Sequence, residues 1–118
     1  MMQPSPLAEA ITRDLLIAEA YTWARRIGVA DRLQEVHVRP MRRKWASIST
    51  RGRLTLSSDL LRQPAAFRRE VLVHELVHLK LGHGLHNALF YALVRAYCSS
   101  EGQDTKEKHP TLALNRNH

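Results

Sequence analysis

The chain has 118 residues, 44% of them hydrophobic and 25% charged, which suits one soluble domain with a single core. Lys and Arg number 18 against 11 Asp and Glu, and the resulting formal charge of +7 is compatible with an acidic or nucleic-acid partner. Cys98 is the one cysteine, which excludes an internal disulfide and a cysteine-based zinc cluster. No apolar run approaches the roughly 20 residues of a membrane span, and the N-terminus lacks the pattern of a secretory signal, so we expect a cytoplasmic protein.

The first predicted element is a helix from Leu7 to about Ile27, where apolar residues recur at three- and four-residue steps. Ser5 is suited to the N-cap, because Pro6 after it is favoured at the first helical position. Gly28 is suited to ending the helix.

The middle of the chain predicts a small sheet. Residues 35–39 alternate and contain β-branched side chains, which indicates a strand closed by Pro40. Residues 44–50 and 53–57 are two short alternating runs around Arg51-Gly52, the pattern of a hairpin. Leu54 and Leu56 share one face of the second run, which we expect to face the core.

The remaining elements are predicted to be helical. Residues 59–62 favour a short helical turn, and a helix is expected from about Pro64 to Leu81, ended by Gly82 and Gly84. Another helix, from about His86 to Ser99, carries an apolar stripe. We therefore expect a single domain over residues 1–99 and a polar C-terminal tail over residues 100–118.

The most informative motif is His74-Glu75-Leu76-Val77-His78, an HExxH sequence inside the apolar run VLVHELVHLKL. Two histidines four residues apart lie one helical turn from each other, so both rings can bind one metal ion. Glu75 lies about 100° around the helix, where it can reach a water bound to that metal. Burial of two imidazoles and a carboxylate on so apolar a helix costs free energy that a bound zinc ion would offset.

The segment from Arg42 to Val94 resembles the YgjP-like metallopeptidase family. Trp45-Ala46-Ser47-Ile48-Ser49 stands where the family has a WGSCS-type strand, the HELVH helix follows, and His86-Asn87-Ala88-Leu89-Phe90-Tyr91 stands for H-x-x-x-F-W. The resemblance implies an α+β, zincin-like domain: an N-terminal helix, a three-stranded antiparallel or mixed sheet, the HExxH helix and a C-terminal helix. In such folds an edge strand flanks the active-site cleft.

A catalytic zinc needs three protein ligands, and HExxH supplies two of them. We expect His86 to be the third, because it aligns with the family histidine and follows a glycine break. His83 is the first alternative, and Glu101 is a second one if a glutamate from a later helix binds the metal. His37, His109 and His118 have no comparable context and are interpreted as surface groups.

These residues predict a zinc-dependent metallopeptidase acting on peptides or proteins. A Zn²⁺ ion held by His74, His78 and His86 would lower the pKa of bound water toward about 7, and Glu75 would act as general base. Tyr91 could stabilise the oxyanion, although a core position is more typical of such an aromatic residue. The strand at residues 45–49 could bind an extended peptide by strand addition, with Trp45 interpreted mainly as a packing residue.

Two other functions remain open at this point. A metal-dependent nucleotide phosphohydrolase is one, which the resemblance to the YgjP-like family also implies, and a nucleic-acid-associated module with a structural or latent zinc site is the other. Both depend on the cations of the predicted hairpin region, which would suit phosphates: Arg39, Arg42, Arg43, Lys44, Arg51 and Arg53.

Overall fold

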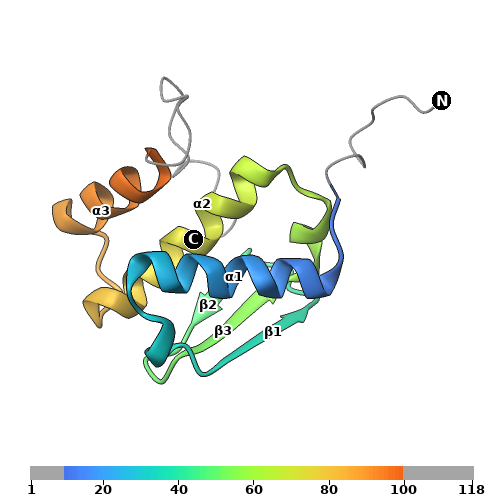
Figure 1. The fold of residues 1–118 in the computed structure, drawn as a ribbon, viewed down its shortest axis with the longest axis horizontal. Coiled ribbons are helices and arrows are strands. Elements are labelled where there is room, and N and C mark those ends of the chain that lie inside the picture. The colour runs from blue at the N-terminus through green and yellow to red at the C-terminus, as the bar shows by residue number, and fades with distance from the viewer. Residues whose placement is uncertain (1–9, 100–118) are drawn as a thin grey trace.

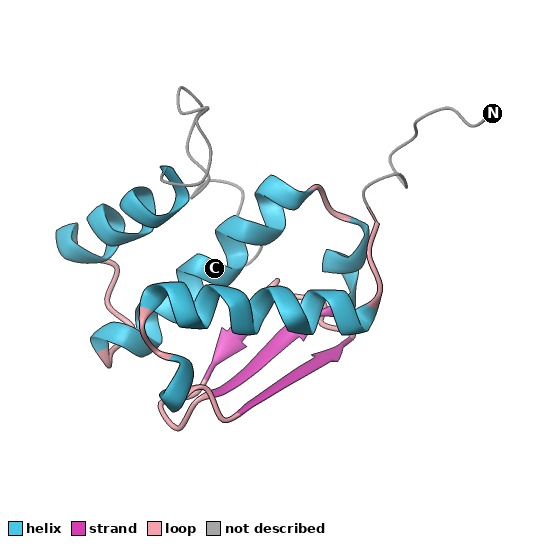
Figure 2. Cartoon of the chain, in the orientation of Figure 1, coloured by secondary structure: helices cyan, strands magenta, loops and turns pink. Residues whose placement is uncertain are grey.

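The computed structural model describes residues 10–99, which fold into three α-helices, two short 3₁₀ helices and three strands (Figures 1 and 2). In chain order these elements are α1 (Arg13–Ile27), η2 (Ala30–Arg32), β1 (Glu35–Arg39), β2 (Ala46–Ile48), β3 (Arg53–Ser57), η3 (Ser58–Arg62), α2 (Ala65–Leu81) and α3 (Ala88–Ser99). The predicted α+β class and the sequence of elements are confirmed.

The sheet is mixed, with strand order β1-β3-β2. β2 and β3 form the predicted antiparallel hairpin, in which Ser47 lies opposite Thr55. β1 pairs with the other side of β3 in parallel, and Val36 lies opposite Leu54. Within the described residues β1 and β2 are therefore the two edge strands, and β2 is the edge that approaches α2.

The core lies between the sheet and the helices. Leu54 and Leu56 on β3 are fully buried, as predicted from their shared face. α1 contacts β1 while α2 contacts β2, and the two helices contact each other, so together they cover one face of the sheet. α3 packs on α2, and Figure 1 shows it at the end of the molecule away from the strands.

The predicted beginning of the first helix is wrong. α1 begins at Arg13, because the Oγ1 atom of Thr12 accepts a hydrogen bond from the Leu15 N–H at 3.1 Å and so caps the helix. The proposed cap at Ser5 and Pro6 lies outside the described residues. The apolar periodicity before Thr12 thus does not continue as helix in residues 10–12.

Gly52 joins the hairpin to the turn that follows α1. Its φ of +92° lies in the left-handed region, and a Cβ there would collide with the carbonyl oxygen of Arg32. The Gly52 carbonyl accepts hydrogen bonds from the N–H groups of Gln34 and Glu35, at 2.8 and 3.2 Å. This close approach places Arg32 beside the end of β2.

Candidate active site

α2 presents the HExxH residues on a side of the helix that is open to a cleft. Eight of its residues are buried, but His74, Glu75 and His78 are only half-buried and line the cleft. The rings of His74 and His78 have centroids 4.9 Å apart, as expected for side chains one helical turn apart. The helix ends at Gly82, whose φ of +78° and N–H bond to the His78 carbonyl allow the chain to turn back.

This turn brings His86 to the two motif histidines. One potential ligand atom from each of His74, His78 and His86 can be chosen so that all three lie within 4.8 Å of one another. The Nε2 atoms of His78 and His86 are 3.1 Å apart. Among the described residues this is the one cluster with three possible metal-binding side chains.

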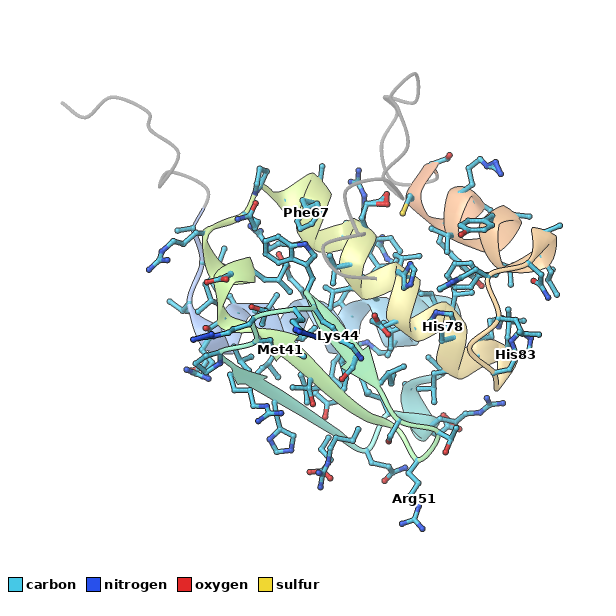
Figure 3. The ribbon with its side chains drawn as sticks, turned by 180° about the vertical axis from the view of Figure 1, so that it is seen from behind. Met41, Lys44, Arg51, Phe67, His78 and His83 are labelled. Atoms are coloured by element: carbon cyan, nitrogen blue, oxygen red, sulfur yellow. The ribbon has the colours of Figure 1, made fainter. Side chains whose placement is uncertain are left out.

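His83 takes a different position. Its backbone carbonyl accepts a hydrogen bond from Nδ1 of His78 at 3.1 Å, while its own Nδ1 accepts one from the Leu85 N–H. A carbonyl can only accept, so Nδ1 of His78 carries the proton and its Nε2 presents a lone pair toward His86. Figure 3 shows His78 and His83 together at the C-terminal end of α2. Glu101, the other alternative, lies outside the described residues, as do His109 and His118.

Phe90 forms an aromatic support for the three histidines. Its side chain is fully buried, and its ring stacks on His78 with centroids 4.5 Å apart. It meets His74 and His86 edge-on, each at 4.9 Å. Phe90 therefore contacts all three imidazoles, which restricts their orientation and shields one side of the cluster from water.

The environment affects the protonation of the motif residues. Burial lowers the pKa of His78, and the charges of His86 and His83 also lower it, although the hydrogen bond to the His83 carbonyl raises it. The lowered pKa favours the neutral imidazole that a metal requires. Burial raises the pKa of Glu75 to about 7, although the positive charge of Lys44 opposes this shift. In both cases the largest cause is the burial of the group at the floor of the cleft.

The cleft has a volume of about 650 Å³ and runs between α2 and the edge strand β2. Its wall includes residues 44–50, and its floor includes Val71, His74, Glu75 and His78. The Ser49 N–H bonds the Arg53 carbonyl, and the Trp45 carbonyl accepts from the Ser57 N–H. In an antiparallel ladder such bonding pairs alternate with residues whose backbone groups point away, so those of Ala46 and Ile48 point outward along the edge of β2 that no strand of residues 10–99 covers.

The structure also shows the positions of three other aromatic or histidine residues named in the sequence analysis. Trp45 packs edge-on against Phe67, with ring centroids 4.9 Å apart, and it also lines the cleft. Tyr91 packs against the core and is not among the cleft-lining residues. His37 is exposed and contacts Glu35 at 2.8 Å.

The six cations of the predicted basic cluster do not converge on one site. Lys44 alone among them lines the cleft. Arg53 pairs with Glu35 at 3.1 Å, and Arg51 lies at the tip of the hairpin, pointing away from the rest of the molecule (Figure 3). The remaining three, Arg39, Arg42 and Arg43, are exposed.

Sequence analysis missed Arg32 as a cleft residue. Arg32 belongs to η2 and lines the cleft, and its Nη1 donates to the Leu79 carbonyl on α2 at 2.9 Å. No local motif marks this arginine, because it reaches the cleft only through the approach of Gly52 to the η2 turn.

A motif helix with a converging third histidine, set beside a small sheet with a free edge strand, is the arrangement of a metal-dependent peptidase. Comparison with known families agrees with this class. The sequence matches the family described as YgjP-like, metallopeptidase domain, over residues 7–112, and the chain belongs to that family.

Solved structures give the same picture. The crystal structure of the metallopeptidase zymogen abylysin from Pyrococcus abyssi is similar at 27% identity, with a TM-score of 0.64, covering 86% of this chain and 97% of that one. The metallopeptidase zymogen jannalysin from Methanocaldococcus jannaschii shares the fold at 20% identity, with a TM-score of 0.60, covering 74% and 82% of the two chains. No curated protein matches the chain significantly. No helix in residues 10–99 has the length and apolarity needed to cross a bilayer.

Proposed function

We propose that the protein is a zinc-dependent peptidase whose metal is bound by His74, His78 and His86. The observation that carries the proposal is the convergence of these three side chains, within 4.8 Å of one another, at the floor of a cleft. Three neutral imidazoles with an open side are a typical ligand set of catalytic zinc.

The three imidazoles suit zinc in their chemistry, and one pair of them also has the spacing that zinc requires. Two nitrogens bound tetrahedrally at about 2.0–2.1 Å from one zinc ion lie roughly 3.3 Å apart. The Nε2 atoms of His78 and His86 are separated by 3.1 Å. The hydrogen bond from Nδ1 of His78 to the His83 carbonyl is the type of contact that fixes a metal-binding histidine in the required tautomer.

When bound, zinc would supply a Lewis acid that lowers the pKa of water and polarises a peptide carbonyl. Glu75 lines the same cleft between the two motif histidines in sequence, and we assign it as the general base. Its carboxylate would accept the proton of the attacking water and donate it to the nitrogen of the leaving amine. The burial of Glu75 limits competition from bulk water for that proton.

The substrate is proposed to be an extended peptide. No strand within residues 10–99 pairs with the outward N–H and C=O groups of Ala46 and Ile48, so these groups can pair with a peptide backbone, as in strand addition. The cleft is lined by the edge strand on one side and by the histidines of α2 on the other, so a peptide paired to the strand would run past the histidine cluster. The phosphohydrolase and nucleic-acid alternatives have less support, because only Lys44 of the six cations lines the cleft that holds the histidines.

The proposal is tested by incubating the purified protein with a mixture of unstructured peptides, in parallel with nucleoside triphosphates. Each reaction is run alone, with a chelator, and with a chelator followed by excess zinc. We expect peptide cleavage that the chelator abolishes and zinc restores, with no phosphate released. Chelator-sensitive release of phosphate without peptide cleavage would overturn the proposal.

A further inference from the structure

The cleft carries two positive charges whose role is not explained by the proposed chemistry. Lys44 and Arg32 both line it, and among residues 10–99 the single carboxylate that lines it is Glu75. The other titratable side chains of the cleft are histidines: His74, His78, His83 and His86. A bound divalent metal would add further positive charge, so the cleft as a whole attracts anions.

Lys44 and Arg32 reach the cleft from two different parts of the chain, the segment before β2 and η2. Lys44 precedes Trp45, whose ring packs on Phe67 in the first turn of α2. Arg32 is held at the other end of the same helix, through its hydrogen bond to the carbonyl of Leu79. The charge of Lys44 acts on Glu75, and Arg32 is bonded to the residue that follows His78, so both cations lie near the motif residues.

Lys44 is available to a ligand. Its side chain is exposed, and within the described residues its Nζ forms no hydrogen bond or ion pair, although its charge acts on Glu75. Figure 3 shows Lys44, His78 and His83 following one another across the molecule. An ammonium group beside a free strand edge can meet the side chain of a peptide paired to that strand.

Arg32 is partly engaged but still has donors to offer. One of its nitrogens is used by the Leu79 carbonyl, which leaves the other guanidinium donors for a second acceptor. The Gly52 contact fixes the backbone of this residue against the hairpin. The side chain of Arg32 is therefore held in place by the protein, whereas that of Lys44 has no hydrogen-bond partner within residues 10–99.

We propose that this cleft selects peptides carrying a carboxylate close to the bond that is cleaved, with Lys44 and Arg32 as the specificity-determining residues. The carboxylate can come from an Asp or Glu side chain or from a free C-terminus, which share the same chemistry. This inference rests on the proposed peptidase function, since it names the substrates of that site.

The test uses a set of labelled peptides of one sequence, with Glu, Gln or Lys at positions flanking the cleaved bond, each made with a free and an amidated C-terminus. Binding is measured by fluorescence anisotropy on the zinc-loaded Glu75→Gln protein, and kcat/KM on the wild type. We expect the Glu peptide to be preferred over its Gln counterpart about fivefold, the size of a single exposed ion pair, and less so at high salt. A difference between free and amidated Gln peptides would identify the chain end as the preferred source of the carboxylate.

Charge reversal separates the cleft from the overall charge. Lys44→Glu or Arg32→Glu should reverse the preference toward the Lys peptide. Arg51→Glu changes the net charge equally but lies at the hairpin tip, outside the cleft lining, and should retain the preference for Glu. Equal binding of the Glu, Gln and Lys peptides would overturn the inference, as would an equal loss of preference in all three variants. If no peptide is cleaved, the proposed function fails, and the binding measurements still decide whether the cleft selects carboxylates.

Discussion

His78 is constrained at both of its ring nitrogens. Nδ1 donates to the His83 carbonyl at 3.1 Å, and Nε2 lies 3.1 Å from Nε2 of His86. The ring face is covered by Phe90, stacked with centroids 4.5 Å apart. A side chain held in this way loses little conformational freedom when a ligand binds, which favours metal affinity.

The two loop histidines should behave differently when replaced. His86→Ala removes a proposed ligand and should lower zinc affinity by more than about 100-fold, since losing the partner of a ligand alone costs about 10–100-fold. His83→Ala is the matched control, because the carbonyl that accepts from His78 belongs to the backbone and is retained. Competition with a chromophoric chelator measures both affinities. If His86→Ala retains stoichiometric zinc and His83→Ala loses it, His83 and not His86 is the third ligand.

A conservative substitution can show whether Glu75 acts as a general base or binds the metal. Glu75→Gln keeps the size of the side chain but cannot accept a proton, so hydrolysis should fall by about 10²–10⁴-fold while zinc remains bound. Parallel measurements of kcat and of zinc content would establish this. Loss of the metal together with activity would place Glu75 among the ligands, and unchanged turnover would remove it from the mechanism.

At the scale of elements, the periodicity of the sequence predicted the strands and helices, but it did not predict how the strands pair. The alternation of residues 35–39 and 53–57 identified both longer strands, and the HExxH run identified α2. The parallel pairing of β1 with β3 could not be predicted, because the same alternation suits either direction of pairing. The start of α1 was missed since apolar spacing extends before Thr12, whereas the capping hydroxyl decides the boundary.

The residues of the site also differ in how far the sequence predicted them. His74, Glu75 and His78 were predicted from local spacing alone, because one helical turn places them together. His86 required the family resemblance, as its distance from α2 depends on how the chain turns at Gly82. The positions of Arg32 and Phe90 relative to the histidines depend on tertiary packing, which no short pattern encodes.

The edge strand offers a test that leaves the sheet intact. The N–H of Ile48 points away from β3, so Ile48→Pro removes a donor proposed for substrate and no ladder bond of the hairpin. We expect KM for peptides to rise severalfold, because one backbone hydrogen bond contributes about 1 kcal/mol. Ile48→Ala is the control for the lost side-chain packing, and circular dichroism checks folding. Equal kinetics for the two variants would contradict binding by strand addition.

At the scale of the whole molecule, one buried carboxyl group lies outside the active site. Glu70 on α2 is 7% exposed, and its Oε1 has no hydrogen-bond partner within residues 10–99. Burial raises the pKa of Glu70, against the smaller effects of a hydrogen bond with Cys98 and the charge of Arg69. The folded state therefore retains a proton that the unfolded state releases, so the free energy of unfolding decreases as pH rises above the ordinary glutamate range.

Replacing this carboxyl should alter the pH profile of stability. Glu70→Gln is expected to unfold at higher denaturant concentration than the wild type at pH 8, with the difference shrinking toward pH 4, where Glu70 is protonated in both states. Glu35→Gln is a contrasting control, because hydrogen bonds from His37 and Arg53 lower the pKa of this exposed carboxyl. Urea titrations across this pH range, with a chelator present, measure both variants. Parallel profiles for the wild type and Glu70→Gln would contradict the expectation.

The most direct test of the whole account is a crystal structure of the zinc-loaded protein with diffraction recorded on both sides of the zinc absorption edge. We predict a single strong anomalous peak per chain, which marks one zinc ion. One ring nitrogen from each of His74, His78 and His86 should bind this ion, with Glu75 beside the coordination position that the protein leaves open. A peak bound elsewhere, or no peak at this cluster under full zinc loading, would contradict the assignment of the catalytic centre.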